Sequence, residues 1–352
     1  MSTRSKQIAA LRPRYEDELA QGLERFFERP RTTCPWCTSA HLRRRLRTAN
    51  HAQRKPGNFV LDECRNCGHV FQNPRLSADG LTFYYRDCYD GLGEATMARL
   101  AASPLAAKLY RARARALLPF SRPLLWLDVG TGHGHFCAEA RRIHPGTEFH
   151  GLDQGEGVEI AARKGRIARA YRGSFTGLAG QLDCRYDVVS MHHYLEHTLS
   201  PRLELTTAYT TLRPGGLLLI EVPDPQSAAA RLFGRWWGPW LQPQHLHLIP
   251  LDNLCGELAE QGFTVVATDR QEPHIPTDLT SAAVNMLHSV LPGENLPWLP
   301  ERPGPLGRGI RTLCLPAAAP ALLALFALDV LLAPVTRRTR LSNAYRVVAR
   351  RD

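Results

Sequence analysis

Three glycines at alternate positions follow a run of apolar residues in the middle of the chain. The stretch LLWLDVGTGHGHF contains Asp128 and then Gly130, Gly132 and Gly134. Because glycine adopts positive φ easily and has no side chain, such a turn can press backbone N–H groups against a ligand at the start of a helix. The GxGxxG fingerprint of dinucleotide sites would need glycine where this chain has His135. The spacing alone therefore indicates a nucleotide-like ligand without separating one from another.

A second acidic residue lies where such a ligand would need it. Asp153 ends the next apolar run, FHGLD, at about the distance where a doubly wound fold places a carboxylate on ribose hydroxyls. Gln154 follows and is placed to contact an adenine edge. The alternative interpretation is that Asp128 and Asp153 are surface aspartates near a connecting loop.

Strand-like and helix-like segments alternate from residue 124 onward. The strand-like runs are nearly continuous in apolar residues, which is typical of a mostly parallel sheet covered by helices on both faces. We expect helices at 134–143, 156–164 and 202–212, and strands at 124–129, 147–153, 186–191, 216–222, 263–269 and 344–350. The sequence therefore predicts an α/β fold with a Rossmann-like sheet.

Three later motifs carry a family resemblance. They are YDVVSMHHYLEHTLSP (186–201), LRPGGLLLIEVPD (212–224) and WLQPQHLHLIPLDNLCGELAEQGF (240–263). With the glycine turn, they make residues 124–270 resemble the class I S-adenosylmethionine (SAM) dependent methyltransferases, especially the bacterial group similar to the ubiquinone-biosynthesis methyltransferases. The resemblance implies a seven-stranded sheet whose last strand is antiparallel, which AYRVVAR at 344–350 would supply.

The same resemblance implies which residues hold SAM. Asp153 would hold the ribose, Ser174 and Phe175 would flank the adenine, and His192 would lie beside the cofactor after the fourth strand. The methionine end is expected against Asp128, Gly130, Thr131, Gly132 and Gly134.

Methyl transfer from a sulfonium is an in-line displacement, so the protein aligns donor and acceptor and, for a hydroxyl acceptor, removes a proton. Histidine suits that task near neutral pH. On a helix starting near His193, the side chains of His193, Glu196 and His197 would share one face. His245, which follows an aromatic-rich segment, is our first choice of base. The alternatives are that Glu196 and His197 brace the helix and that His245 caps a lid or contacts the substrate.

Two features of the segment after the fourth strand exclude particular chemistries. In the ubiquinone branch a similar helix presents Glu, Glu and His to a divalent metal, whereas this chain has His193 at the first place, so we do not expect a magnesium site. Methyltransferases that act on exocyclic amines of bases have an Asn or Asp, Pro, Pro, aromatic motif there. This chain has Ser-Met-His-His-Tyr, so base N-methylation is not expected.

Two CxxC pairs precede the sheet: Cys34 with Cys37, and Cys64 with Cys67. Four thiolates at this spacing can close a tetrahedron around Zn²⁺, with a β-hairpin taking up the intervening chain. The continuation CGHVFQNPRLS resembles a zinc-ribbon leader found before many bacterial methyltransferases. We expect a structural zinc because every ligand is cysteine; the alternative is four reduced cysteines without metal.

Charge and composition bear on partners and compartment. A net charge of +11 and a pI near 9.5 raise nucleic acid or anionic membrane as partners. The alternative is a compositional bias toward arginine, and we rank nucleic acid below a small-molecule, glycan or lipid-linked acceptor. Nine unevenly spaced cysteines and an N-terminus without an apolar run favour a reducing cytoplasm.

Residues 315–334 are nearly long and apolar enough to span a bilayer. If 344–350 completes the sheet, a single crossing would leave that strand on the wrong side of the membrane. Either the segment lies in or loops back through the interface of the inner membrane face, or it is buried against the catalytic domain or a partner subunit. Arginines flank both of its ends: Arg308, Arg311, Arg337, Arg338 and Arg340.

The sequence predicts one enzyme domain with appendages. The leading hypothesis is an O-methyltransferase, with C- or N-transfer left open; the alternatives are an RNA methyltransferase that grips phosphates with its zinc ribbon and basic surface, and a non-catalytic SAM-binding accessory subunit. Oligomerisation is left open. The expected parts are an N-terminal helix (1–30), a zinc-ribbon-like module (31–75), a helical linker or lid (76–120), the SAM-binding core (121–270), an apolar helical insertion (271–342) and the last strand (343–352).

Overall fold

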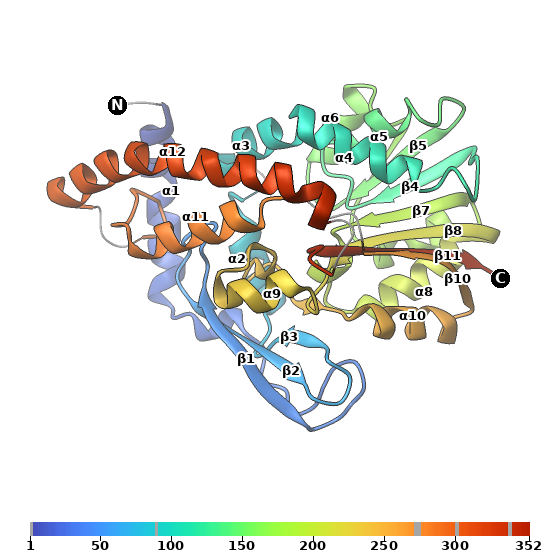
Figure 1. The fold of residues 1–352 in the computed structure, drawn as a ribbon, viewed down its shortest axis with the longest axis horizontal. Helices are drawn as coiled ribbons and strands as arrows, with labels where there is room; N and C mark the ends of the chain where they lie inside the picture. The colour runs from blue at the N-terminus through green and yellow to red at the C-terminus, as the bar shows by residue number, and fades with distance from the viewer. Residues whose placement is uncertain (1–2, 89–90, 271–275, 300–302, 337–339) are drawn as a thin grey trace. The chain divides into compact units, whose positions relative to one another are not determined.

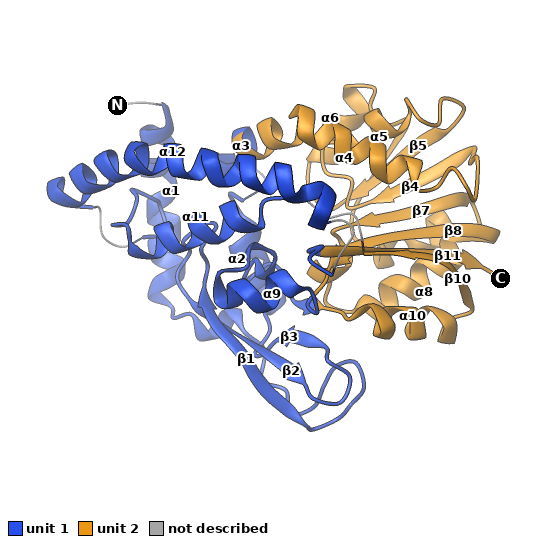
Figure 2. Ribbon diagram, in the orientation of Figure 1, with its two compact units in different colours: residues 1–95, 225–247, 275–343 blue, residues 96–224, 248–274, 344–352 orange. Residues whose placement is uncertain are grey.

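The computed structural model describes residues 3–88, 91–270, 276–299, 303–336 and 340–352 (Figure 1). The chain forms two compact units, each built from separate stretches of sequence (Figure 2). Unit 1 comprises Met1–Ala95, Pro225–His247 and Ile275–Asn343, and unit 2 comprises Thr96–Asp224, Leu248–His274 and Ala344–Asp352.

Unit 2 contains a seven-stranded sheet in the order β10-β11-β8-β7-β4-β5-β6. The pairs that link β6, β5, β4, β7 and β8 are parallel, and β11 is antiparallel to both of its neighbours. This topology confirms the predicted Rossmann-like sheet with an antiparallel last strand. The strands are β4 (Leu125–Val129), β5 (Glu148–Asp153), β6 (Arg169–Arg172), β7 (Tyr186–His192), β8 (Leu212–Pro223), β10 (Phe263–Asp269) and β11 (Ala344–Arg351).

Helices cover both faces of this sheet, as the apolar strands require (Figure 1). One face carries α4, α5 and α6, which bury apolar side chains around Trp126 of β4. The indole N–H of Trp126 donates to Ser190 Oγ at 2.8 Å, so the only polar atom of the ring is satisfied. The helices are α4 (Pro104–Arg115), α5 (His135–Ala140), α6 (Gly157–Arg163), α7 (Ala179–Leu182), α8 (Pro201–Thr211) and α10 (Leu251–Glu260).

Unit 1 is built around the cysteine module. Strands β1 (Leu42–Ala49) and β2 (Asn58–Cys64) form the expected antiparallel hairpin, and β3 (Val70–Gln72) pairs with β2. The backbone N–H of Gln72 donates to the carbonyl of Leu246, which brings the segment before β9 (His247–Leu248) to the far edge of β3. The sheet order is therefore β1-β2-β3-β9.

The N-terminal helix packs on an aromatic core of unit 1. Helix α1 spans Thr3–Ala20 and so ends before the boundary expected at residue 30; Gly22, with a φ of +85°, follows its end. The ring of Tyr15 meets Phe83 of α2 (Ala78–Tyr85) edge-on, and the Tyr15 hydroxyl donates to Asp87 at 2.8 Å. Lys55 is buried beside these rings and donates to two backbone carbonyls.

The segment between β10 and β11 forms two helices, α11 (Asp278–Val290) and α12 (Pro305–Thr336). This confirms the predicted helical insertion before the last strand. Among the described residues, α12 is the helix that is long and apolar enough to cross a membrane by length and composition. Only Asp329 and Ala333 of α12 are buried, so most of the helix is not packed against its own chain. The remaining helices are α3 (Gly91–Ala101) and α9 (Ala228–Phe233).

Candidate SAM and metal sites

The glycine turn joins β4 to α5 and adopts the predicted positive-φ conformation, which glycine takes up easily. Gly130, Gly132 and Gly134 have φ values of +76°, +50° and +71°. A Cβ at Gly130 would lie 2.8 Å from the ring of Tyr194, whereas a Cβ at Gly132 would meet nothing within 4 Å. The turn is therefore packed against Tyr194 at Gly130 and open at Gly132, so a ligand could contact its backbone there.

Asp153 lies next to this turn at the carboxyl edge of the sheet. Parallel pairing of β4 and β5 sets Val129 beside Leu152, so the two strands end together. The Asp153 carboxylate accepts from the backbone N–H of Gly132 at 2.9 Å and from that of Gly155 at 2.8 Å. The structure thus brings the turn and the predicted ribose carboxylate together, with Gln154 exposed beside them.

Asp128 has a different setting from Asp153. It is 3% exposed, and its carboxylate accepts from Ser190 Oγ of β7 at 2.6 Å and from the thiol of Cys137 in α5. Burial raises the pKa of Asp128 to about 6, although the hydrogen bond from Ser190 acts in the opposite direction. Asp128 therefore ties β4 to β7 and α5 beneath the turn.

His192 lies near the turn with the hydrogen-bonding capacity of its ring unused. It ends β7, its ring packs 4.4 Å from that of Phe136, and neither ring nitrogen has a hydrogen-bond partner among the described residues. Burial, and then the charge of Arg113, hold its pKa well below the ordinary range, so the ring is neutral at pH 7. Buried nitrogens without partners are costly unless a ligand satisfies them, so His192 and the open face at Gly132 fit a bound SAM.

The other predicted SAM residues differ in accessibility. Thr131 is 8% exposed and its hydroxyl lies 3.6 Å from Cys137 Sγ. Ser174 is exposed after β6, whereas Phe175 is fully buried. In this conformation Ser174 can present its side chain to an adenine, but Phe175 can present only its backbone.

The segment after β7 does not form the α-helix that we predicted from 193 onward. Only Leu195–His197 is helical, as a single 3₁₀ turn, and His193 has a φ of +51°. The prediction that His193 and Glu196 meet is nevertheless confirmed, because His193 Nδ1 lies 3.1 Å from a Glu196 oxygen. The tight turn therefore brings His193 and Glu196 together, as we had expected an α-helix to do.

His193 belongs to a buried charge network centred on Glu221, near the end of β8. Its Nε2 lies 3.1 Å from Glu221 Oε1, the same oxygen that accepts two hydrogen bonds from Arg113, at 2.5 and 2.8 Å. Arg346 of β11 donates to the other oxygen at 2.9 Å. We did not predict this network because Arg113, Glu221 and Arg346 lie far apart in sequence, so no local spacing brings them together.

The network determines the charge states within it. Arg113 and Arg346 hold the pKa of Glu221 well below its usual range despite burial. Burial lowers the pKa of His193, but Glu196 and Glu221 outweigh it and raise the pKa above the ordinary value. A carboxylate at each nitrogen favours the cationic imidazole and occupies both nitrogens, so His193 does not suit the role of general base.

Tyr194 and Glu204 form a further pair that we did not predict. The Tyr194 hydroxyl donates to Glu204 Oε2 at 3.1 Å, and the ring of Tyr194 supports Gly130. Burial raises the pKa of Glu204 to about 7. Glu204 of α8 therefore positions the aromatic ring on which the glycine turn rests.

His245, our predicted base, belongs to unit 1 and is 5% exposed. Its Nδ1 lies 2.8 Å from the carbonyl oxygen of Pro239, which can only accept, so Nδ1 carries the proton. The neutral ring then has its basic electron pair on Nε2, as a general base requires. The nearby Trp237 and Trp240 are buried and pack edge-on, with ring centroids 4.9 Å apart.

The four predicted metal ligands come together in unit 1. The sulfurs of Cys34, Cys37, Cys64 and Cys67 all lie within 4.8 Å of one another. Two of the pairs are 3.7 and 3.5 Å apart, close to the roughly 3.8 Å that separates ligands at 2.3 Å from a tetrahedral zinc. Ligand type, number and spacing thus fit Zn²⁺ with no position left for substrate.

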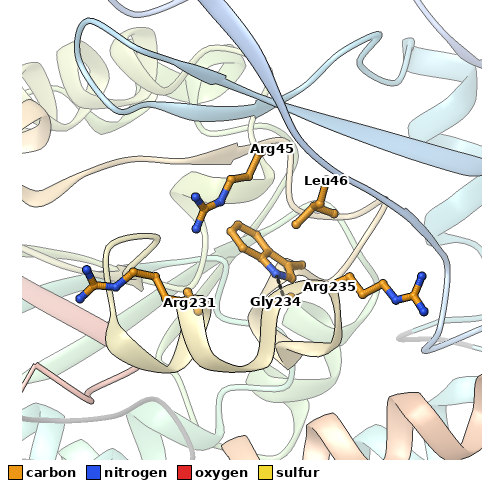
Figure 3. Close-up of a pocket in the computed structure, with 7 residues that line it drawn as sticks. Arg45, Leu46, Arg231, Gly234 and Arg235 are labelled. Carbon is orange, nitrogen blue, oxygen red and sulfur yellow. Dashed lines mark hydrogen bonds between the residues drawn. The ribbon is translucent and has the colours of Figure 1, made fainter.

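Unit 1 also has an arginine-lined pocket of about 310 Å³ (Figure 3). Arg45 reaches it from β1, whereas Arg231 and Arg235 belong to α9 and the turn after it and point to opposite sides. Trp240 is part of the wall. Guanidinium groups beside an indole suit an anionic group on a planar or apolar ligand.

Comparisons with known proteins agree with this geometry. Residues 100–268 match a family model described as a methyltransferase domain. A ubiquinone biosynthesis O-methyltransferase of Cereibacter sphaeroides is 30% identical over 138 residues, which are 38% of this chain and 55% of the relative. This region is a SAM-dependent methyltransferase domain. The match spans just over half the length of that relative.

Solved structures similar to the methyltransferase domain share little sequence with it. A SAM-dependent methyltransferase from Archaeoglobus fulgidus is 20% identical with a TM-score of 0.44, covering 69% of this chain and 94% of that one. Magnesium protoporphyrin IX methyltransferase from Synechocystis PCC 6803 is 13% identical with a TM-score of 0.45, covering 77% and 100%.

The cysteine cluster predicts one bound zinc ion per chain. We expect Cys64→Ser to lower the zinc content and the stability of unit 1, because a metal ion with four thiolate ligands contributes directly to folding. Elemental analysis and thermal unfolding of the purified protein measure both effects. Cys184→Ser, at an exposed cysteine outside the cluster, is the control. Zinc-free protein with unchanged unfolding would show that the four cysteines are simply reduced thiols.

The charge network predicts a large loss of stability in Glu221→Gln. The change removes the negative charge between two buried arginines and should cost about 3–5 kcal/mol, as other broken buried ion pairs do. Urea unfolding measures the effect. Glu159→Gln removes a half-exposed partner of Arg172 and should cost less than about 1 kcal/mol. Equal effects of the two changes would contradict the central role of Glu221.

Proposed function

We propose that this chain is an active methyltransferase that moves the methyl group of SAM to a hydroxyl oxygen of a small-molecule, glycan or lipid-linked acceptor in the cytoplasm. The observation that carries the proposal is the open glycine turn with Asp153 beside it, within the methyltransferase domain. The O-methyltransferase activity of the curated relatives supports oxygen as the accepting atom.

Each residue of the candidate site has a limited role in this proposal. When bound, SAM supplies a methyl group activated by a positively charged sulfur. Asp153 holds the ribose hydroxyls, the backbone of Gly130–Gly134 lies against the methionine end, and His192 donates or accepts a hydrogen bond inside the site. Gln154 and Ser174 lie at the exposed rim, where an adenine edge would be met.

The proton of the acceptor hydroxyl is removed by a histidine, for which His245 is our first choice. Its Nδ1–H is held by the Pro239 carbonyl, which fixes the tautomer with a basic Nε2. Glu196 and His197 remain candidates as catalytic residues or as braces of the turn that carries them. His193 is not, because carboxylates occupy both of its nitrogens.

Asp153→Ala should weaken SAM binding by about 10²–10⁴-fold, since two hydrogen bonds to a charged group are each worth about 1.5–3 kcal/mol. Calorimetric titration with SAM measures the loss. Glu156→Ala, an exposed acidic residue of the same loop, is the matched control and should bind SAM normally. Undiminished binding by Asp153→Ala would remove the ribose role assigned to this carboxylate.

His245→Gln should leave SAM affinity unchanged and lower kcat by about 10²–10⁴, the usual contribution of a positioned acid or base. Calorimetric titration with SAM and single-turnover measurements of methyl transfer test the two statements. Loss of SAM binding, or an unchanged rate of transfer, would contradict the assignment.

The acceptor class is tested by labelling. The protein is incubated with SAM labelled on its methyl group and a lysate separated into lipid, glycan, RNA, protein and small-molecule fractions. Label in the lipid, glycan or small-molecule fraction is the expected result.

A second candidate function rests on the pocket lined by Arg45 of the zinc-ribbon module and by Arg231 and Arg235, since clustered arginines also suit RNA phosphates. Label in RNA alone, with binding that weakens steeply as salt rises, would replace our proposal with this one. No turnover in any fraction, with SAM still bound, would favour a non-catalytic accessory subunit.

A further inference from the structure

The surface of α12 is unlike that of a helix facing water. Every exposed residue between Leu313 and Val335 is leucine, valine, alanine, phenylalanine or proline. Leu323 is 68% exposed and Leu331 is 73% exposed. The less exposed residues recur mostly at helical spacing, and Asp329 among them contacts α11: Cys314, Leu315, Ala318, Leu322, Leu325, Asp329 and Ala333.

The extent of this apolar surface indicates its partner. A surface helix of a water-soluble protein has polar residues opposite its packed stripe, and a helix that docks on one protein has a second apolar stripe. Here the whole arc outside the packed stripe is apolar between Leu313 and Val335. Lipid hydrocarbon covers such an arc without needing a matching protein surface.

The one charged residue within this stretch is turned inward. The carboxylate of Asp329 accepts from the backbone N–H groups of Leu279 and Thr280, at 3.0 and 2.9 Å, and from the Thr280 hydroxyl at 2.7 Å. Asp329 thus caps the N-terminus of α11, where a negative charge is favoured. Its charge presents no obstacle to lipid on the opposite side of α12.

Helix α12 is attached to α11 and to the segment just after α11, at one point in each of its halves. Asp329 holds its second half to the start of α11, and Arg311 bonds the Pro292 carbonyl and Glu294 just after α11 ends. Helix α11 lies alongside α12 and is itself attached to the rest of unit 1, for example through Asn285 to the carbonyl of Trp236 at 3.1 Å.

We propose that α12 lies in the plane of a membrane surface, with its apolar arc in the lipid and α11 on the water side. An upright helix would draw α11 and its polar attachments into hydrocarbon, where unsatisfied polar groups cost several kcal/mol each. The net charge of +11 and the arginines at the ends of the segment favour anionic lipid. Arg337 and Arg338 of this set lie outside the described residues. The inference does not depend on methyl transfer.

Vesicle flotation tests whether lipid covers the apolar arc of α12. The full-length protein should float with vesicles of phosphatidylcholine and phosphatidylglycerol, and more weakly with phosphatidylcholine alone. The double variant Leu323→Glu/Leu331→Glu should bind at least about tenfold more weakly, because two exposed apolar contacts become charges. Leu124→Glu, at a leucine of unit 2 that is 71% exposed, is the matched control and should bind normally. Unfolding curves of all variants check that each is folded.

Two outcomes of this experiment would overturn the proposal. The first is equal vesicle binding by the double variant and the unsubstituted protein. The second is absence of vesicle binding together with a lipid-free dimer that the double variant converts to monomer, which would assign the arc to a second copy of the chain.

Depth measurements test the orientation. Tryptophan is placed singly at Leu313, Leu323 and Leu331, and the added fluorescence is quenched by lipids brominated at defined carbons. An in-plane helix predicts similar, shallow depths for all three positions. A tryptophan at 323 near the bilayer centre, with the other two close to opposite surfaces, would show a crossing helix and overturn the proposed orientation.

Discussion

Strand β11 pairs with β8 on one side and β10 on the other, and this pairing constrains everything between those strands in sequence. The chain leaves the sheet at the end of β10, builds α11 and α12, and must return to the same edge. Whatever the insertion contacts, its two ends remain on one side of any membrane. The antiparallel last strand thus limits an apolar segment of membrane-spanning length to an in-plane or looping arrangement.

Glu221 and Asp329 are both buried carboxylates surrounded by hydrogen-bond donors, but they hold different parts of the structure together. Glu221 is surrounded by Arg113, Arg346 and His193, and it fastens the ends of β8 and β11 to the turn after β7. Asp329 is held by N–H and hydroxyl donors at the start of one helix. Neither could be buried without such partners, since an isolated charge in a protein interior is too costly.

Local patterns in the sequence were enough to predict most strands of the sheet, the glycine turn and the cysteine cluster, whereas the family resemblance implied seven strands and an antiparallel last one. Apolar runs and fixed spacings report directly on strands, tight turns and metal ligands, so they can be read without knowing the fold. The pattern did not predict β6, a four-residue strand that begins and ends with arginine. It also predicted an α-helix from His193 onward, where a backbone of positive φ forms a 3₁₀ turn. The Glu221 network depends on residues more than 100 positions apart, which no local pattern reveals.

The apolar helix shows how a structure can distinguish interpretations that hydropathy leaves open. The same run of leucine and alanine suits a membrane span, a core helix or an interfacial helix. Exposure along α12 argues against the core helix, and the return of β11 argues against a single span. Because Asp329 caps α11, its position also shows which side of α12 faces the protein. Asp329 lowers the hydropathy of the segment, yet its contact with α11 is what leaves the apolar arc of α12 on the side away from the protein.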